Sequence, residues 1–198
     1  KKRVLLIDLD PHGNATMGSG INKSELKLTV YNVLLGECTV EQAKIISETG
    51  KFDILPANRD LAGAEIELVD IEGRELRLKN ELREIASSFD YILIDCPPAL
   101  NLLTLNGLCA AQSVMIPMQC EYYALEGLSD LVNTIRKVRE NLNPDLEIEG
   151  LLRTMFDPRN TLAQQVSDQL QQHFGEKVYR TVIPRNVRLA EAPSYGVP

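Results

Sequence analysis

The stretch from residue 4 to residue 16, VLLIDLDPHGNAT, constrains the fold of this chain more than any other. It opens with an apolar run of the kind that forms a strand covered on both faces, and it breaks into a loop that contains proline, glycine and asparagine. A carboxylate is costly to bury inside such a strand, so we expect Asp8 and Asp10 at its carboxyl end, beside a cation or hydrogen-bond donors. That end of a parallel sheet is where α/β proteins bind their ligands. The alternative interpretation is a strand end closed by an Asx turn, with no ligand.

A second apolar run, YILIDCPP over residues 91–98, repeats this pattern and ends in Asp95. Two strands that deliver carboxylates to one edge of a sheet indicate a bound Mg²⁺ and a phosphorylated ligand. Pro97 and Pro98 stop the strand and stiffen the loop that follows. This arrangement suits a metal-site carboxylate followed by a segment that responds to a γ-phosphate.

Strand-like runs alternate with helical stretches along the whole chain, which predicts an α/β fold with a single doubly wound, mostly parallel sheet and flanking helices. Apolar residues at helical spacing predict a long helix over residues 124–143 and a shorter one over 162–174, and residues 61–86 form a charged amphipathic stretch. No linker or repeat interrupts the pattern, so residues 1–198 are expected to form one domain. The expected strands cover residues 4–10, 52–56, 91–95, 113–118, 148–155 and 178–184.

Composition narrows the function classes. The 198 residues are 44% hydrophobic and 25% charged, which is enough for one domain with a sizeable core. A net charge of −7 argues against a constitutively basic nucleic-acid module, so any DNA binding is expected to be conditional. The sequence has neither an 18-residue apolar run nor a signal peptide, and we expect a cytoplasmic protein without a membrane span.

The cysteines and histidines predict no metal site or disulfide. No C-x-x-C pair is present, so reduced thiols are expected, and the two histidines have no spacing that completes a metal site with them. The residues concerned are Cys38, Cys96, Cys109, Cys120, His12 and His173.

Four segments, in this order and spacing, closely resemble the ParA/Soj family of partitioning ATPases: VLLIDLDPHGNAT, YILIDCPPALNLLTLNGL, SVMIPMQCEYYALEGL and VIPRNVRLAEAPSYG. That family belongs to the deviant Walker A P-loop group, with MinD and the nitrogenase iron protein. The resemblance runs from about Lys2 to the C-terminal residue and implies a P-loop NTPase-like fold, with ATP and Mg²⁺ as cofactors. The family's phosphate loop, K-G-G-x-G-K-T, precedes the segment seen here. We therefore expect a fragment that lacks the first βα unit and the extreme C-terminus, and that is inactive alone.

The resemblance also implies roles for the three aspartates. Asp10 matches the family residue that positions the attacking water, and Asp8 matches the one that supports the hydration shell of Mg²⁺. Asp95 matches the Walker B aspartate, which holds Mg²⁺ mainly through water. The family loop is commonly D-P-Q-G-N, and here His12 replaces the glutamine.

Further along the chain, Pro184, Arg185 and Asn186 match a loop that packs on adenine, and Thr154 stands where the wider group often has an adenine-reading asparagine. The resemblance assigns Arg188, and Arg185 with it, to DNA phosphate contacts. On composition alone, both are ordinary surface arginines.

The resemblance implies a function as well: an ATP-dependent chromosome or plasmid partitioning switch. ATP joins two subunits in a homodimer that binds DNA without sequence preference on the nucleoid, and a ParB-like partner stimulates hydrolysis. One alternative is a non-catalytic fragment or scaffold of the same fold. Another is a MinD-like membrane-cycling ATPase, which needs an amphipathic C-terminal helix; the segment EYYALEG at residues 121–127 looks more like ParA/Soj.

Overall fold

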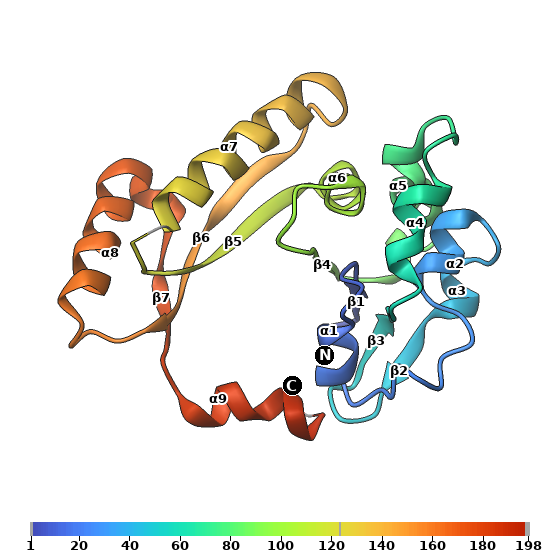
Figure 1. Cartoon of the computed structure of the whole chain (residues 1–198), viewed down its shortest axis with the longest axis horizontal. Coiled ribbons are helices and arrows are strands. Elements are labelled where there is room, and N and C mark those ends of the chain that lie inside the picture. The colour runs from blue at the N-terminus through green and yellow to red at the C-terminus, as the bar shows by residue number, and fades with distance from the viewer. Residues whose placement is uncertain (1, 123, 197–198) are drawn as a thin grey trace. The chain divides into compact units, whose positions relative to one another are not determined.

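The computed structural model describes residues 2–122 and 124–196, and it divides into two compact units (Figure 1). The first unit comprises Lys1–Ala111 with Glu191–Pro198, and the second comprises Gln112–Ala190. Tyr123, which belongs to the segment at residues 121–127, lies outside the described residues, as do Lys1, Val197 and Pro198.

The first unit is built on a four-stranded sheet with the order β2-β3-β1-β4. The central strand β1 pairs in parallel with β3 and β4, whereas β2 pairs antiparallel with β3. Because β1, β3 and β4 are parallel, their carboxyl ends lie at one edge of the sheet. The strands are β1 (Val4–Asp8), β2 (Ile45–Ser47), β3 (Phe52–Leu55) and β4 (Tyr91–Asp95).

Short helices supply most of the remaining core of this unit. Leu5, Ile7 and Leu9 are fully buried and belong to one apolar cluster with residues of the helices. The helices are α1 (Asn14–Gly18), α2 (Val30–Leu35), α3 (Val40–Ala43), α4 (Leu61–Glu67), α5 (Arg77–Leu82) and α6 (Leu102–Ala110), with 3-10 turns at Arg74–Leu76, Ala86–Ser88 and Ala192–Tyr195.

The second unit has a three-stranded parallel sheet with the order β5-β6-β7. Two amphipathic helices make the crossovers between its strands (Figure 1). Each buries apolar residues along one face. Asn160 caps the second of these helices by accepting hydrogen bonds from the backbone N–H groups of Leu162 and Ala163. The elements are β5 (Ser113–Gln119), α7 (Ala124–Asn141), β6 (Glu147–Phe156), α8 (Thr161–Phe174), a 3-10 turn (Gly175–Lys177), β7 (Val178–Pro184) and α9 (Val187–Glu191).

The α/β class and the mostly parallel strand pairing are confirmed. The sequence predicted a single sheet. The described strands form two sheets, one in each unit, and β4 and β5 are edge strands that do not pair with each other. The prediction of one domain over residues 1–198 stays a prediction. No helix among residues 2–122 and 124–196 is both long and apolar enough to cross a membrane.

Two local features of the structure were not predicted. Strand β2 was missed, because it has only three residues and two of its side chains, Ile45 and Ile46, are exposed. The amphipathic stretch at 61–86 is interrupted, because Gly73 adopts a left-handed φ of 70° between α4 and the turn before α5.

Candidate functional site

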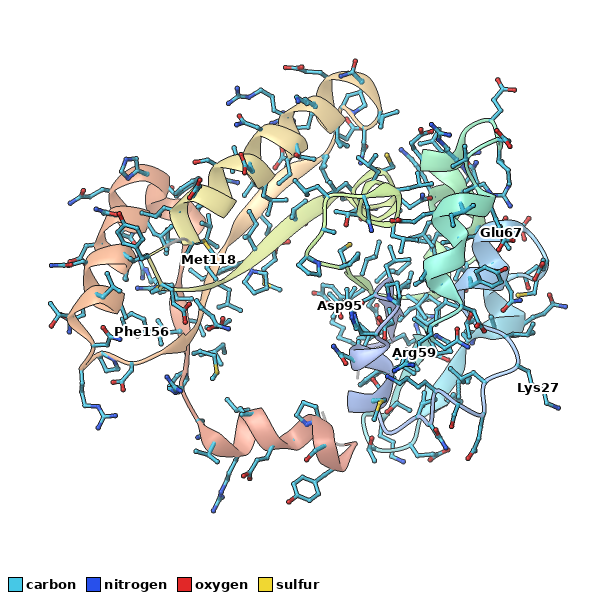
Figure 2. All side chains as sticks on the ribbon, viewed as in Figure 1. Lys27, Arg59, Glu67, Asp95, Met118 and Phe156 are labelled. Carbon is cyan, nitrogen blue, oxygen red and sulfur yellow. The ribbon has the colours of Figure 1, made fainter. Side chains whose placement is uncertain are left out.

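Three carboxylates meet at the carboxyl ends of β1 and β4, and we call Asp8, Asp10 and Asp95 the carboxylate rim. Asp8 and Asp95 end their strands and are register partners in the sheet. The backbone N–H of Leu9 donates to the carbonyl oxygen of Asp95 at 2.8 Å, and that of Asp10 donates to Asp8 Oδ1 at 3.1 Å. Figure 2 shows Asp95 at this edge. The prediction that the two apolar runs bring their aspartates to one edge is confirmed.

Asp8 anchors the loop that follows β1. Its side chain is fully buried, and Oδ2 accepts hydrogen bonds from Thr16 N at 2.8 Å and Thr16 Oγ1 at 2.7 Å. Thr16 Oγ1 in turn accepts from the backbone N–H of Ala57 at 2.9 Å. Burial raises the pKa of Asp8, while the hydrogen bonds from Thr16 and Asp10 oppose that rise. Both oxygens of Asp8 are thus engaged by the chain itself, and its role toward Mg²⁺ stays a prediction.

Asp95 differs from Asp8 in its hydrogen bonds and in its contact with solvent. Burial, followed by the negative charges of Asp8 and Asp10, raises the pKa of Asp95 to about 6. Its side chain nevertheless reaches solvent, so water screens part of this penalty on the charged form. Among residues 2–122 and 124–196, no group donates a hydrogen bond to its carboxylate. A cation at this position would relieve the repulsion within the carboxylate rim.

The loop after β1 can only be made with glycine at position 13. Gly13 has a left-handed φ of 64°, and its N–H donates to the carbonyl oxygen of Asp10 at 2.9 Å. A Cβ at this position would come within 2.8 Å of the carbonyl oxygen of Ala57. This turn places Asp10 beside the sheet edge, with 15% of its side chain exposed.

The donor set of the carboxylate rim fits Mg²⁺ held largely through water. In the described part of the chain, no three side chains of His, Cys, Asp or Glu are placed to hold a metal ion together. Mg²⁺ keeps several of its waters and takes one or two carboxylates together with substrate phosphates. Asp95 has free oxygens, and no described residue donates to Asp10 Oδ2, so both can hold a hydrated ion or a water molecule.

In the second unit, the predicted adenine loop follows β7. Pro184 ends the strand, and Arg185 N donates to the carbonyl oxygen of Phe156 at 3.1 Å, which ties this loop to the end of β6. Asn186 Oδ1 accepts from Arg188 N at 2.8 Å. Thr154 is half-buried on β6, in register with Gln119.

A small pocket of about 160 Å³ lies at the same ends of β5, β6 and β7. Arg185 lines this pocket, whereas Pro184, Asn186 and Thr154 do not. The structure therefore brings one of the four predicted nucleotide-binding residues to a described pocket. Its lining is Gln119, Cys120, Glu121, Met155, Asp157, Asn160, Ala163 and Arg185.

Comparison with known proteins decides the family. A family model described as an AAA domain matches residues 1–148. The sporulation initiation inhibitor protein Soj of Bacillus subtilis is 54% identical over 197 residues, which cover 100% of this chain and 78% of Soj. The chromosome partitioning protein ParA of Myxococcus xanthus is 50% identical over 198 residues, covering 100% of this chain and 70% of ParA. The chain belongs to the ParA/Soj family. This is a family of chromosome-partitioning ATPases.

A solved structure similar to this ParA/Soj chain shares its fold. It is cobyrinic acid a,c-diamide synthase from Mycobacterium smegmatis, with a bound ATP analog and magnesium. The two chains are 38% identical with a TM-score of 0.88, and the match covers 98% of this chain and 80% of the synthase.

Two residues of this ParA/Soj chain that the sequence did not single out shape the small pocket. Met155 has a left-handed φ of 50° at an irregularity in the pairing of β6 with β7, and nothing in its residue type predicts this. Hydrogen bonds from Arg159, together with the charges of Arg159 and Arg185, lower the pKa of Asp157 to about 2. Asp157 could have been anticipated from the turn-forming sequence DPRN before α8.

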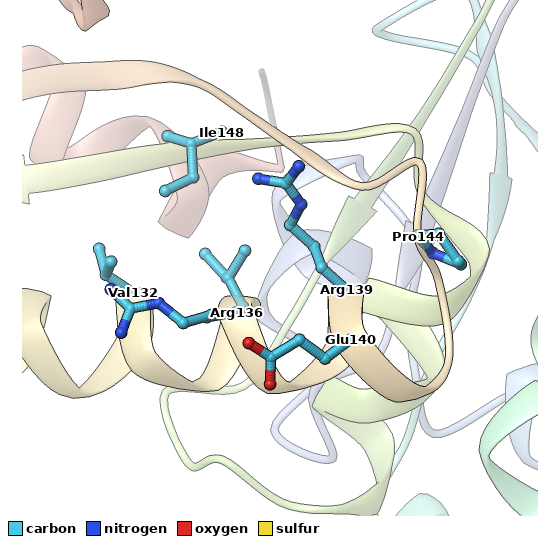
Figure 3. A pocket seen from close by; sticks show the side chains of 7 residues that line it. Val132, Arg136, Arg139, Glu140, Pro144 and Ile148 are labelled. Carbon is cyan, nitrogen blue, oxygen red and sulfur yellow. The ribbon is translucent and has the colours of Figure 1, made fainter.

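The larger described pocket of this ParA/Soj chain, about 490 Å³, lies elsewhere in the second unit, between α7 and the start of β6 (Figure 3). None of the predicted site residues lines it, so its size does not make it the functional site. Its lining is Val132, Ile135, Arg136, Arg139, Glu140, Pro144 and Ile148.

Arg188 lies on α9 and is exposed. Its backbone N–H is held by Asn186, whereas its guanidinium has no hydrogen bond or ion pair with any residue that the structure describes. This leaves the charge available to a partner, and the predicted DNA contact of the ParA/Soj chain stays a prediction.

Proposed function

We propose that this chain carries the hydrolytic carboxylates of an ATP-dependent chromosome or plasmid partitioning switch. The observation behind the proposal is the carboxylate rim, in which two neighbouring strands place Asp8, Asp10 and Asp95 together in a member of the ParA/Soj family. The magnesium and ATP analog bound to the related synthase support ATP and Mg²⁺ as the cofactors.

The three aspartates have different tasks in this proposal. Asp95, whose carboxylate has no donor among the described residues, holds the hydration shell of Mg²⁺, which neutralises charge on the phosphates when it is bound. Asp10 has one oxygen free of hydrogen bonds from the described residues and orients the water that attacks the γ-phosphate. Asp8 supports the metal's hydration shell indirectly, by holding the N–H of Asp10 and the start of α1 in place.

A separate assignment concerns the loop after β7 in the second unit. Arg185 lines the small pocket, and Pro184 and Asn186 flank it in the chain, so we assign this loop to the adenine base. Thr154 is assigned to the same base, on the neighbouring strand β6. The 198 residues contain no K-G-G-x-G-K-T phosphate loop, and we infer that a polypeptide of these residues alone binds and hydrolyses ATP negligibly.

DNA binding depends on ATP in this proposal. With a net charge of −7, one subunit repels DNA, and binding requires arginines of two subunits on one face of an ATP-bound homodimer. Arg188 is the leading candidate for that face and Arg185 is second. A ParB-like protein is the proposed partner that stimulates hydrolysis, in the cytoplasm and on the nucleoid.

Gel-shift measurements over a series of salt concentrations test this function. They use a Soj chimera, in which the parts of Bacillus subtilis Soj that lie outside its match to this chain are joined to residues 1–198. We expect binding of unrelated DNA sequences with ATP and not with ADP. Arg188→Glu should weaken binding equally on all sequences and reduce its salt dependence, because a phosphate contact carries no base information.

Lys137→Glu is the matched control, since it reverses one exposed charge on α7. Unchanged affinity and salt slope in Arg188→Glu remove Arg188 from the DNA surface. Equal DNA binding with and without ATP contradicts the switch.

A further inference from the structure

His12 contacts the side chain that the proposed function makes catalytic. Its ring Nδ1 lies 2.6 Å from Asp10 Oδ1, and its backbone N–H donates to the same oxygen at 2.9 Å. Two donors therefore converge on one oxygen of Asp10, and no described residue donates to the other. The sequence resemblance places a glutamine here in the common family loop, so in this chain the ring contact comes from His12 in its place.

Hydrogen-bond chemistry assigns the tautomer of the His12 ring. An ionised carboxylate only accepts hydrogen bonds, so a hydrogen bond between such a group and Nδ1 of His12, 2.6 Å away, assigns the hydrogen to Nδ1. The short distance is typical of a charge-assisted hydrogen bond. The common neutral form of histidine in water carries its proton on Nε2, so the contact selects the other tautomer.

The backbone of the loop holds His12 in position for this contact. Lys23 Nζ donates to the carbonyl oxygen of His12 at 2.5 Å, and the left-handed turn at Gly13 fixes the chain on its other side. The His12 ring itself is 79% exposed, whereas the Asp10 side chain is 15% exposed. Because the His12 side chain is exposed, its contact with Asp10 adds little to the stability of the fold, and its main effect falls on the orientation of Asp10.

We propose that His12 is a positioning residue that holds the Asp10 carboxylate in one rotamer, with Oδ1 tied to the loop and Oδ2 left for the attacking water. The inference rests on the proposed function of Asp10. Without the ring contact, the carboxylate keeps only the backbone donor and samples more orientations. A water held less precisely for in-line attack reacts more slowly, although ATP binds equally well.

The first test is independent of ATP. Long-range ¹H–¹⁵N NMR correlations on the 198-residue chain at pH 8 report which ring nitrogen carries the proton. His173 Nδ1 also lies 2.7 Å from an oxygen, the carbonyl of Gln169, so a His173→Gln background leaves His12 as the single histidine observed. We expect the Nδ1–H tautomer at His12, and a return to Nε2–H in Asp10→Ala. An Nε2–H tautomer in both proteins overturns the proposal.

The second test measures ATP hydrolysis in the Soj chimera. His12→Ala should lower kcat about tenfold with KM for ATP changed less than about twofold, a split that follows from misplacing the water alone. His12→Gln should restore most of the rate, because an amide N–H can also donate to Asp10. His173→Ala is the matched control, an exposed histidine on α8 that should hydrolyse ATP at the rate of the parent.

The Asp10→Ala variant distinguishes the catalytic role of Asp10 from the positioning role of His12. If Asp10→Ala hydrolyses ATP at the parent rate, the catalytic assignment fails, whatever His12 does. If Asp10→Ala is inactive while His12→Ala keeps the parent kcat, the catalytic assignment stands and the positioning role of His12 is wrong.

Discussion

Removing one hydroxyl group should reveal how strongly Asp8 holds the carboxylate rim together. Thr16 Oγ1 donates to Asp8 Oδ2 at 2.7 Å and accepts from the backbone N–H of Ala57 at 2.9 Å, and all three residues are fully buried. Thr16→Val keeps the shape of the side chain and deletes both hydrogen bonds. The buried N–H of Ala57 is then left without its acceptor. Asp8 Oδ2 keeps the hydrogen bond from Thr16 N and loses the one from the hydroxyl group.

The magnitude follows from these two losses. An unsatisfied buried N–H costs about 1–3 kcal/mol, and a hydrogen bond to a charged group is worth about 1.5–3 kcal/mol. The two losses share one hydroxyl and are not independent, so we expect the free energy of unfolding to fall by about 3 kcal/mol. This is a large share of the roughly 5–15 kcal/mol that stabilises a typical domain.

Urea unfolding at 25 °C, followed by circular dichroism, measures the effect. Thr16→Ser keeps the hydroxyl and should lose no more than about 1 kcal/mol, chiefly for the missing methyl group. The m-value should be the same for the parent and both variants, because the surface exposed on unfolding does not change. A Thr16→Val protein within about 0.5 kcal/mol of the parent refutes the view that this hydroxyl anchors Asp8.

Two further predictions concern Asp95 and ATP. Burial and the charges of Asp8 and Asp10 raise the pKa of Asp95 to about 6. Between about pH 4 and pH 6 the folded chain therefore keeps a proton that the unfolded chain releases. The stability that Asp95 contributes is present below that range and is lost as the pH rises through it. Urea unfolding from pH 4 to pH 7 should therefore show a steeper decline for the parent than for Asp95→Asn, and parallel curves contradict the assignment. For ATP, isothermal titration calorimetry on the 198-residue polypeptide should detect no binding at micromolar concentrations, since no phosphate loop is present to hold the anion. Mg²⁺-dependent binding in that range disproves this expectation.

The sequence predicted the carboxylate rim because its signal is local. An apolar run that ends in an aspartate specifies both a buried strand and the position of its polar end, and the runs at β1 and β4 both carry this signal. Parallel pairing then brings Asp8 and Asp95 together without further information. The long helices α7 and α8 were predicted for the same reason, since their apolar residues recur at helical spacing over several turns.

The features that the sequence did not predict depend on contacts between distant residues. Thr16 and Ala57 are 41 positions apart, and nothing near either residue indicates that the hydroxyl of one satisfies the N–H of the other. The three-residue strand β2 exists because β3 offers it a partner, and its exposed isoleucines give no burial pattern. The left-handed backbone of Met155 likewise follows from the irregular end of β6, where a methionine has no intrinsic preference for that conformation.

The most direct test of the proposed switch is ATP hydrolysis by the Asp10→Ala variant of the Soj chimera, measured in single turnover beside ATP binding by the same protein. The carboxylate orients the attacking water and takes no part in holding the phosphates, so hydrolysis should fall at least about a hundredfold while ATP affinity stays within about threefold of the parent. Asp95→Ala should instead weaken Mg²⁺-dependent binding itself. Hydrolysis by Asp10→Ala at the rate of the parent would contradict the assignment of the catalytic carboxylate and, with it, the function proposed for the carboxylate rim.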